Sequence, residues 1–277
     1  MDDTNIIITG QTNEQLKSLA TKIISEIKKL FASLNLTLNL DKTMYMTFFT
    51  DVDLGICVEN TPIKFVKTTT FLGLEISSSL SWEPQCVKLI KNLNLANFLL
   101  RQISKCVSRA HLLKVYHAFF GSHMLYGIVL WGNENLNENL CKKIFGKQKT
   151  AIRIIYYGRP YYGKERKEKS CRGIFKELKI LTLTSQFILN TAIYVKKYLE
   201  GFVNGKFREH NTRTKNKIHQ LHGARQSPQN YATVVFNKLP ISITREKDLK
   251  KIKKTLKDWL MEKEFYGLSE YFKDSTD

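Results

Sequence analysis

The stretch TNEQLKSLATKIISEIKKLFASL, residues 12–34, carries the clearest periodic signal in the chain. Its apolar residues recur at three- and four-residue spacing, from Leu16 to Leu34, with lysines on the opposite side. This spacing predicts a long helix with one apolar face. Thr12 and Gln15 match the T-x-x-Q capping box that begins a helix.

Short β-branched and aromatic runs around this helix predict strands. We expect strands at 5–9, 44–49 and 71–76, and a hairpin that joins 56–58 to 63–65. Residues 1–80 are therefore predicted to form an α+β unit, with one long helix and several short antiparallel strands. The run at 5–9 has no strand before it, although every strand must pair with something.

Beyond Trp82 the pattern becomes helical. Periodic apolar residues predict helices at 84–105, 108–127, 137–157, 171–179, 185–200 and 245–263, with Ser108 as the N-cap of the second. Residues 201–230 are polar and basic, and they predict a long loop. The fold expected after residue 80 is mostly α-helical.

The charge balance points to a polyanionic partner. The chain has 277 residues with 44 Lys and Arg against 25 Asp and Glu, so its formal net charge is +19. Residues 142–173 hold eleven basic and two acidic residues (11 − 2 = +9), interleaved with tyrosines at 156, 157, 161 and 162. This pattern is typical of nucleic-acid binding. A solvated helix face with tyrosines packed beneath it is the alternative for this segment.

Several classes of protein are excluded by what the sequence lacks. The five cysteines contain no CxxC pair, so neither a disulfide framework nor a zinc knuckle is expected. No apolar run approaches the ~20 residues that span a bilayer, and no signal pattern opens the chain. We expect an intracellular protein, nuclear or cytoplasmic, with no membrane partner.

Several segments carry a further pattern in their order and spacing. The chain opens with Met1-Asp2-Asp3-Thr4; LTLNLDKT follows at 36–43, FLG at 71–73, LSW at 80–82 and YGIVLWG at 126–132. Together they resemble the reverse transcriptases of jockey-like non-LTR (LINE-type) retrotransposons. In that family an Asp-Asp motif, an L-x-L-N-x-x-K-T signature and an F-L-G turn follow one another. The similarity continues at 148–153, 210–213 and 236–240, so it covers almost the whole chain.

This resemblance implies a domain order and a chemistry. Residues 1–80 would be the C-terminal part of a polymerase palm, 81–157 a helical thumb, and 158–277 a basic C-terminal region. The full-length parent would transfer nucleotides from dNTP with two Mg²⁺ ions. Asp2 would be the main metal ligand and Asp3 the auxiliary one. Lys42 would lie near the pyrophosphate as a positive charge or proton donor, with an ordinary surface lysine as the alternative.

The resemblance also implies the nucleic-acid contacts. The turn of Phe71, Leu72 and Gly73 would position the primer terminus. An RNA template paired with a DNA primer would lie along the thumb, and its phosphates would be contacted independently of sequence. The candidate phosphate contacts are Lys142, Lys143, Lys147, Lys149, Arg153 and Arg159.

In the family, another essential Asp and the fingers precede the Asp-Asp motif. We therefore expect the 277-residue chain alone not to extend a primer and not to bind Mg²⁺ stably, although it could still bind template–primer. Two alternatives stay open. One is a nucleic-acid-binding module without catalysis, built from the thumb and the basic tail. The other is an interaction protein whose exposed sheet edge pairs with another chain.

Overall fold

The computed structural model describes residues 4–158, 170–198, 218 and 227–274. The chain divides into two compact units, Met1–Pro84 (unit 1) and Gln85–Asp277 (unit 2). It is mostly helical, with a few short strands in small sheets. The predicted domain boundary after residue 80 lies close to the division between the units.

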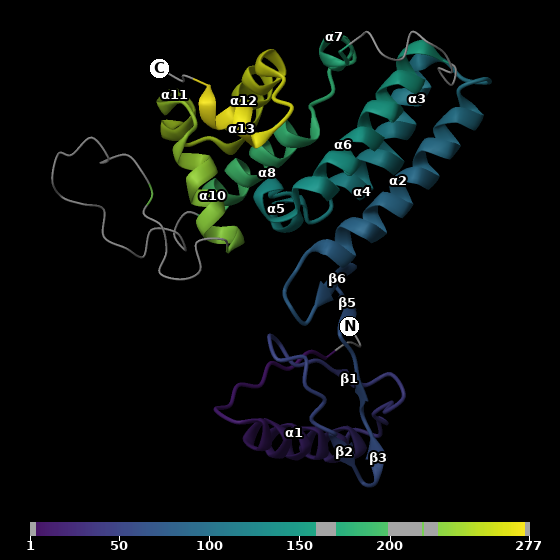
Figure 1. Cartoon of the computed structure of the whole chain (residues 1–277), viewed down its shortest axis with the longest axis vertical. Coiled ribbons are helices and arrows are strands. Elements are labelled where there is room, and N and C mark those ends of the chain that lie inside the picture. The colour runs from purple at the N-terminus through teal and green to yellow at the C-terminus, as the bar shows by residue number, and fades with distance from the viewer. Residues whose placement is uncertain (1–3, 159–169, 199–217, 219–226, 275–277) are drawn as a thin grey trace, which may run out of the picture. The chain divides into compact units, whose positions relative to one another are not determined.

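Unit 1 is built on the long helix α1, Asn13–Ser33, as the periodicity predicts (Figure 1). Thr12 is its N-cap, and the Thr12 hydroxyl accepts a hydrogen bond from the Gln15 N–H at 3.2 Å. The Gln15 side chain accepts in turn from the Gln11 N–H at 2.8 Å. At the other end Asn35 has φ +56°, and the Leu36 N–H donates to the Phe31 carbonyl at 2.8 Å. This is the Schellman arrangement that ends helices.

The strands of unit 1 are shorter than predicted. β1 (Met44–Tyr45) pairs in parallel with β4 (Lys64–Phe65), and β2 (Cys57–Val58) pairs antiparallel with β3 (Thr61–Pro62). The β2–β3 pair confirms the predicted hairpin, although Lys64 and Phe65 pair with β1. β5 (Thr68–Phe71) and β6 (Leu74–Ser77) form a second antiparallel hairpin.

One strand prediction is wrong, and two are only partly right. Residues 5–9 form no strand, because their backbone has no partner in a ladder within the described residues. Only Met44 and Tyr45 of 44–49 form a strand; at the far end Phe49 has φ +68°, which a strand cannot accommodate, and its N–H donates to the Ser78 carbonyl at 3.0 Å. Residues 71–76 are not one strand, because the chain turns at 72–73 and returns as β6.

The core of unit 1 is small. Four residues, from α1 and from the β2–β3 hairpin with the residues that flank it, are buried together: Ala20, Ile56, Val58 and Ile63. On the predicted apolar face of α1 only Ala20 is buried, and Leu30 and Leu34 are 56% and 60% exposed. Few apolar side chains therefore stabilise this unit by leaving water.

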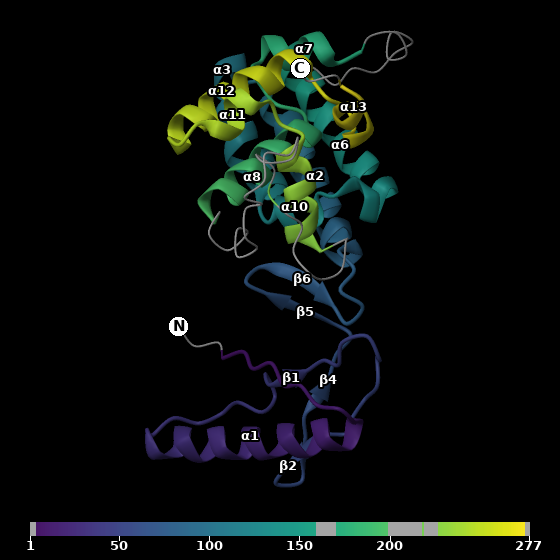
Figure 2. The ribbon, with the colours of Figure 1, turned by 90° about the vertical axis from the view of Figure 1, so that its left-hand side faces the viewer.

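Unit 2 is a helical assembly (Figure 2). After α2 (Glu83–Ile103), which begins at the end of unit 1, the helices are α3 Arg109–Val115, η1 Tyr116–Gly121, α4 Ser122–Leu125, α5 Ile128–Trp131, α6 Glu134–Tyr157, α7 Arg172–Glu177, α8 Leu183–Lys197, α10 Pro228–Asn237, α11 Ile241–Arg245, α12 Leu249–Lys263 and α13 Leu268–Lys273. α8 lies at the centre and packs against α5, α10 and α12.

The predicted helix 108–127 is divided. Ser108 is at the N-cap position, but its hydroxyl bonds the His111 imidazole at 2.8 Å and does not cap the backbone. η1 is a π-helical segment, so the helix gains a residue there and its faces rotate. Within the predicted loop 201–230, α10 begins at Pro228, because Ser227 caps it and proline suits the first helical position; 201–217 and 219–226 lie outside the described residues.

The five cysteines are free thiols. Cys57 in unit 1 and Cys106 in unit 2 are exposed, whereas Cys86, Cys141 and Cys171 are buried. Burial raises the pKa of the Cys141 and Cys171 thiols. In the described parts of the chain, no helix is long and apolar enough to cross a membrane.

Candidate nucleic-acid interface

The LTLNLDKT segment at 36–43 is folded as a turn around Asn39. The Asn39 Oδ1 accepts a hydrogen bond from the Lys42 N–H at 3.1 Å. The Asn39 carbonyl accepts from the N–H and the hydroxyl of Thr43, at 3.1 and 2.8 Å. Such local contacts are typical of Asn and Thr outside helices. The Lys42 side chain is exposed, so the turn leaves its ammonium group in solvent.

Phe71, Leu72 and Gly73 form the end of the β5–β6 hairpin. Phe71 faces Leu74 in the last pair of the ladder, and Leu72 and Gly73 have φ values of +47° and +81°. Positive φ at both central residues is the type I′ geometry of two-residue hairpins, which glycine adopts freely and leucine does not. Leu72 is 65% exposed and Phe71 37%, so the turn presents an apolar tip.

The remaining predicted residues do not complete this site. Asp2, Asp3 and Arg159 lie outside the described residues. Among the residues that are described, no group of three or more His, Cys, Asp or Glu could hold a metal ion. Lys42 and the hairpin belong to unit 1, whereas the other predicted cations lie on α6 in unit 2.

The five α6 cations occupy two sides of that helix. At 100° per residue, Lys142, Lys149 and Arg153 share one side, and Lys143 and Lys147 lie on the next. Lys142 and Lys143 are exposed, and the other three are half-buried. The rest of the helix circumference packs inward, where Ile144, Gln148, Ala151, Ile152 and Ile155 are buried.

Two of these five cations already interact with other side chains of the protein. Lys142 forms an ion pair with Glu138 one turn earlier. The Lys149 ammonium lies over the Phe145 ring, 4.8 Å from its centroid, and 5.9 Å from that of Tyr266. Such cation–aromatic contacts attract the ammonium to the ring face. Lys143, Lys147 and Arg153 form no ion pair in the described part of the chain. Among these three only Lys143 is exposed, and Lys147 lies on the same side of α6, so we take these two as the phosphate contacts.

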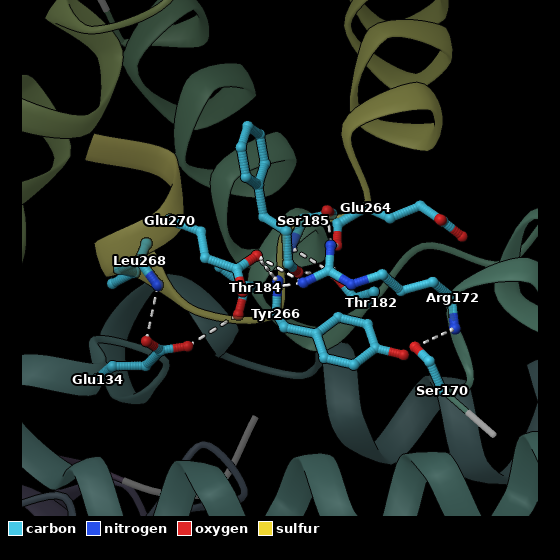
Figure 3. Close-up of polar contacts among 11 residues, drawn as sticks. Glu134, Ser170, Arg172, Thr182, Thr184, Ser185, Glu264, Tyr266, Leu268 and Glu270 are labelled. Atoms are coloured by element: carbon cyan, nitrogen blue, oxygen red, sulfur yellow. Dashed lines mark hydrogen bonds and ion pairs between the residues drawn. The ribbon is translucent and has the colours of Figure 1, made fainter. Parts of the chain in front are cut away.

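Arg172 has a structural role (Figure 3). Its guanidinium forms two hydrogen bonds to the Glu270 carboxylate, at 2.9 and 3.0 Å, and one to the Glu264 carbonyl at 3.0 Å. It also lies 4.3 Å from the Tyr266 ring centroid. Figure 3 shows Glu134 beside this group, where its carboxylate accepts from the Leu268 N–H at 2.8 Å. These contacts fasten the α12–α13 segment to α6 and α7.

Of the two tyrosines described in the basic segment, one is held by contacts within the protein and the other is exposed. Tyr156 packs under Arg109, whose guanidinium carbon lies 4.9 Å from the ring centroid, and the Tyr156 carbonyl accepts from Arg109 at 3.1 Å. The neighbouring Glu177 raises the pKa of the Tyr156 hydroxyl. Tyr157 is 39% exposed, and residues 161 and 162 lie outside the described residues. Tyr156 therefore fits the alternative in which the tyrosines of this segment pack against the protein.

Two other segments of the resemblance are explained by packing. In YGIVLWG, Gly127 has φ +63°, and the buried Trp131 donates from Nε1 to the Tyr126 carbonyl at 2.8 Å. Gln148, fully buried, donates to the Tyr116 hydroxyl and to the Leu181 carbonyl, both at 3.0 Å, and accepts from the Leu183 N–H at 2.8 Å. Burial raises the pKa of Tyr116.

The charge of the chain is divided between the two units. Residues 1–84 contain 7 Lys and Arg and 10 Asp and Glu (7 − 10 = −3). Residues 85–277 contain the other 37 Lys and Arg and the other 15 Asp and Glu (37 − 15 = +22). The prediction from 142–173 missed a second set of exposed lysines on α12, although their three- and four-residue spacing is visible in the sequence.

Comparisons with known proteins leave the family open. No protein-family model matches the chain. No curated protein and no solved structure matches it either.

Proposed function

We propose that this chain is a reverse-transcriptase-type polypeptide whose unit 2 binds the phosphate backbone of a template–primer duplex. The observation that carries this proposal is the charge division, −3 on unit 1 against +22 on unit 2. Such an excess on one folded unit attracts a polyanion and draws counterions from it. The finer assignment of palm and thumb rests on the sequence motifs.

Two local features support the reverse-transcriptase part of the proposal. FLG at 71–73 forms a tight turn at a hairpin tip, and LTLNLDKT at 36–43 forms a turn that exposes Lys42. These are arrangements that a primer terminus and a pyrophosphate could approach. Mg²⁺ would be held by carboxylates such as Asp2 and Asp3, where it would supply Lewis-acid activation for nucleotide transfer.

Contacts to phosphate should be sequence-independent and weakened by salt, because each one releases counterions. We expect Lys143 and Lys147 to contribute, since both lie on one side of α6 without an ion-pair partner in the described structure. Their side chains are one helical turn apart, close enough to contact neighbouring phosphates of one strand.

The test is fluorescence anisotropy of a labelled RNA–DNA hybrid titrated with the 277-residue chain over a series of salt concentrations. A Lys143→Gln/Lys147→Gln variant should lower the slope of log K against log salt by about 2, at roughly 0.9 for each phosphate that is no longer neutralised. The matched control is Lys22→Gln/Lys29→Gln, which removes the same charge from exposed positions in unit 1. Equal slopes for both variants would refute the α6 assignment, and no binding by the unmodified chain would refute the function.

A further inference from the structure

α12 presents opposite chemistry on two of its sides. Ile252, Leu256 and Leu260 are buried in unit 2 at four-residue spacing. An adjoining side carries exposed lysines at i, i+3, i+4 and i+7, namely Lys250, Lys253, Lys254 and Lys257. At 100° per residue these four lie on one side of the helix. They form a continuous row, which we call the α12 lysine row.

Carboxylates in the described part of the chain do not neutralise this row. No ion pair joins any of its four lysines to a carboxylate in the described residues, and Asp258, one turn after Lys254, also makes none. Other lysines of unit 2 do form ion pairs or hydrogen bonds within the protein. Lys263, on the same helix, pairs with Asp274 at 2.8 Å, and Lys196 donates to the Thr244 and Glu246 carbonyls.

The row repels itself. Lysines at i and i+4, as in Lys250 with Lys254 and Lys253 with Lys257, destabilise a helix, because like charges are held one turn apart. An adjacent Lys257 also lowers the pKa of His117, after the larger effect of ring burial. A polyanion bound along α12 would relieve this repulsion.

The spacing fits a nucleic-acid strand. From Lys250 to Lys257 the helix rises about 10 Å at 1.5 Å per residue. A duplex strand carries one phosphate per about 3.4 Å of its axis, so roughly three phosphates lie within the length of four lysines. An anionic membrane fits less well, because surface-bound helices insert an apolar face, and that of α12 is buried inside the protein.

We propose that the α12 lysine row is a second phosphate-backbone contact of unit 2, separate from α6, and that it takes a strand of duplex nucleic acid irrespective of base sequence. The inference rests on the proposed function and locates a further part of the same interface. It gives a binding role to α12, a helix for which none of the sequence motifs predicts such a role.

The test uses the full chain with all four lysines of the row changed to glutamine, a residue of similar helix propensity, so that α12 is retained. The matched control changes four scattered exposed lysines of unit 2, Lys91, Lys105, Lys176 and Lys179, to glutamine. A third variant, with arginine at the four row positions, keeps the charge. Circular dichroism checks that each variant is folded.

In the hybrid-binding assay, the row variant should lower the salt slope by about 2.7, at roughly 0.9 for each of about three neutralised phosphates. The control should change it by less than about one, and the arginine variant should bind like the unmodified chain. If the unmodified chain binds and the row variant matches the control, the α12 inference alone is overturned. If the chain binds phosphatidylserine vesicles and no duplex, both the inference and the proposed function are overturned.

Discussion

Replacing Gly132 by alanine should destabilise unit 2. A Cβ at this position would lie 2.6 Å from the Ile128 carbonyl oxygen and 2.7 Å from Cδ2 of Phe187. Carbon atoms in contact prefer separations of about 3.5–4.0 Å, so the neighbours must move by nearly 1 Å. Ile128 and Phe187 are both buried, and one of the clashing atoms is a backbone oxygen, so these neighbours cannot easily move aside. Overpacking of this kind costs about 1–3 kcal/mol.

The same substitution at Gly146 is the matched control, and it should have the opposite sign. Gly146 lies within α6, and a Cβ there meets nothing within 4 Å. Glycine inside a helix costs about 0.5–1 kcal/mol relative to alanine, so Gly146→Ala should stabilise unit 2 by that amount. Each variant adds one methyl group, yet the unfolding free energies of the two variants should differ by about 1.5–4 kcal/mol.

Urea unfolding followed by far-UV circular dichroism measures both values by linear extrapolation. Binding of the hybrid duplex by folded Gly132→Ala protein should be unchanged, because Gly132 packs inside unit 2. The packing argument fails if Gly132→Ala unfolds within about 0.5 kcal/mol of the unmodified chain, the range of ordinary surface changes. It also fails if the two alanine variants shift in the same direction.

Three further outcomes are expected. In Lys257→Ala, the NMR-titrated pKa of His117 should rise but stay below its ordinary value, because ring burial is the larger cause; an unchanged value would mean that the two groups do not interact. Leu72→Asn should stabilise the β5–β6 hairpin by up to about 1 kcal/mol in hydrogen exchange, since Asn tolerates positive φ better than Leu. Gln148→Ala should cost about 3 kcal/mol or more in urea unfolding, because it leaves buried hydrogen-bonding groups of three residues unpaired; a destabilisation below about 1 kcal/mol would refute that count.

The sequence predicted the long helices well, because their signal is local. α1, α2 and α6 follow from apolar residues repeated over several turns, and the start of α1 follows from Thr12 and Gln15. The strands were predicted less well. A strand exists only where a distant segment supplies hydrogen-bond partners, and 5–9 has the composition of a strand without such a partner in the described structure.

Prediction of the candidate site was limited by the same dependence on distant segments. Sequence located a basic segment, but it could not tell which cations the fold itself would occupy. Arg172 is bound to Glu270, which lies 98 residues later in the chain. Lys149 lies over Phe145, one turn earlier on α6, but also over Tyr266 in the segment between α12 and α13, a contact that only the tertiary fold creates. The π-helical segment at 116–121 was equally hidden, since one extra residue in a helix leaves no distinct composition.

The placement of the cysteines equips the natural chain for distance measurements. Cys57 and Cys106 are exposed, one in each unit, while the other three thiols are buried and those of Cys141 and Cys171 have raised pKa values that leave little reactive thiolate. A maleimide dye pair should therefore label one site per unit without any substitution. Energy transfer between the two dyes, followed as duplex is added, would report directly whether the units approach one another around a bound strand.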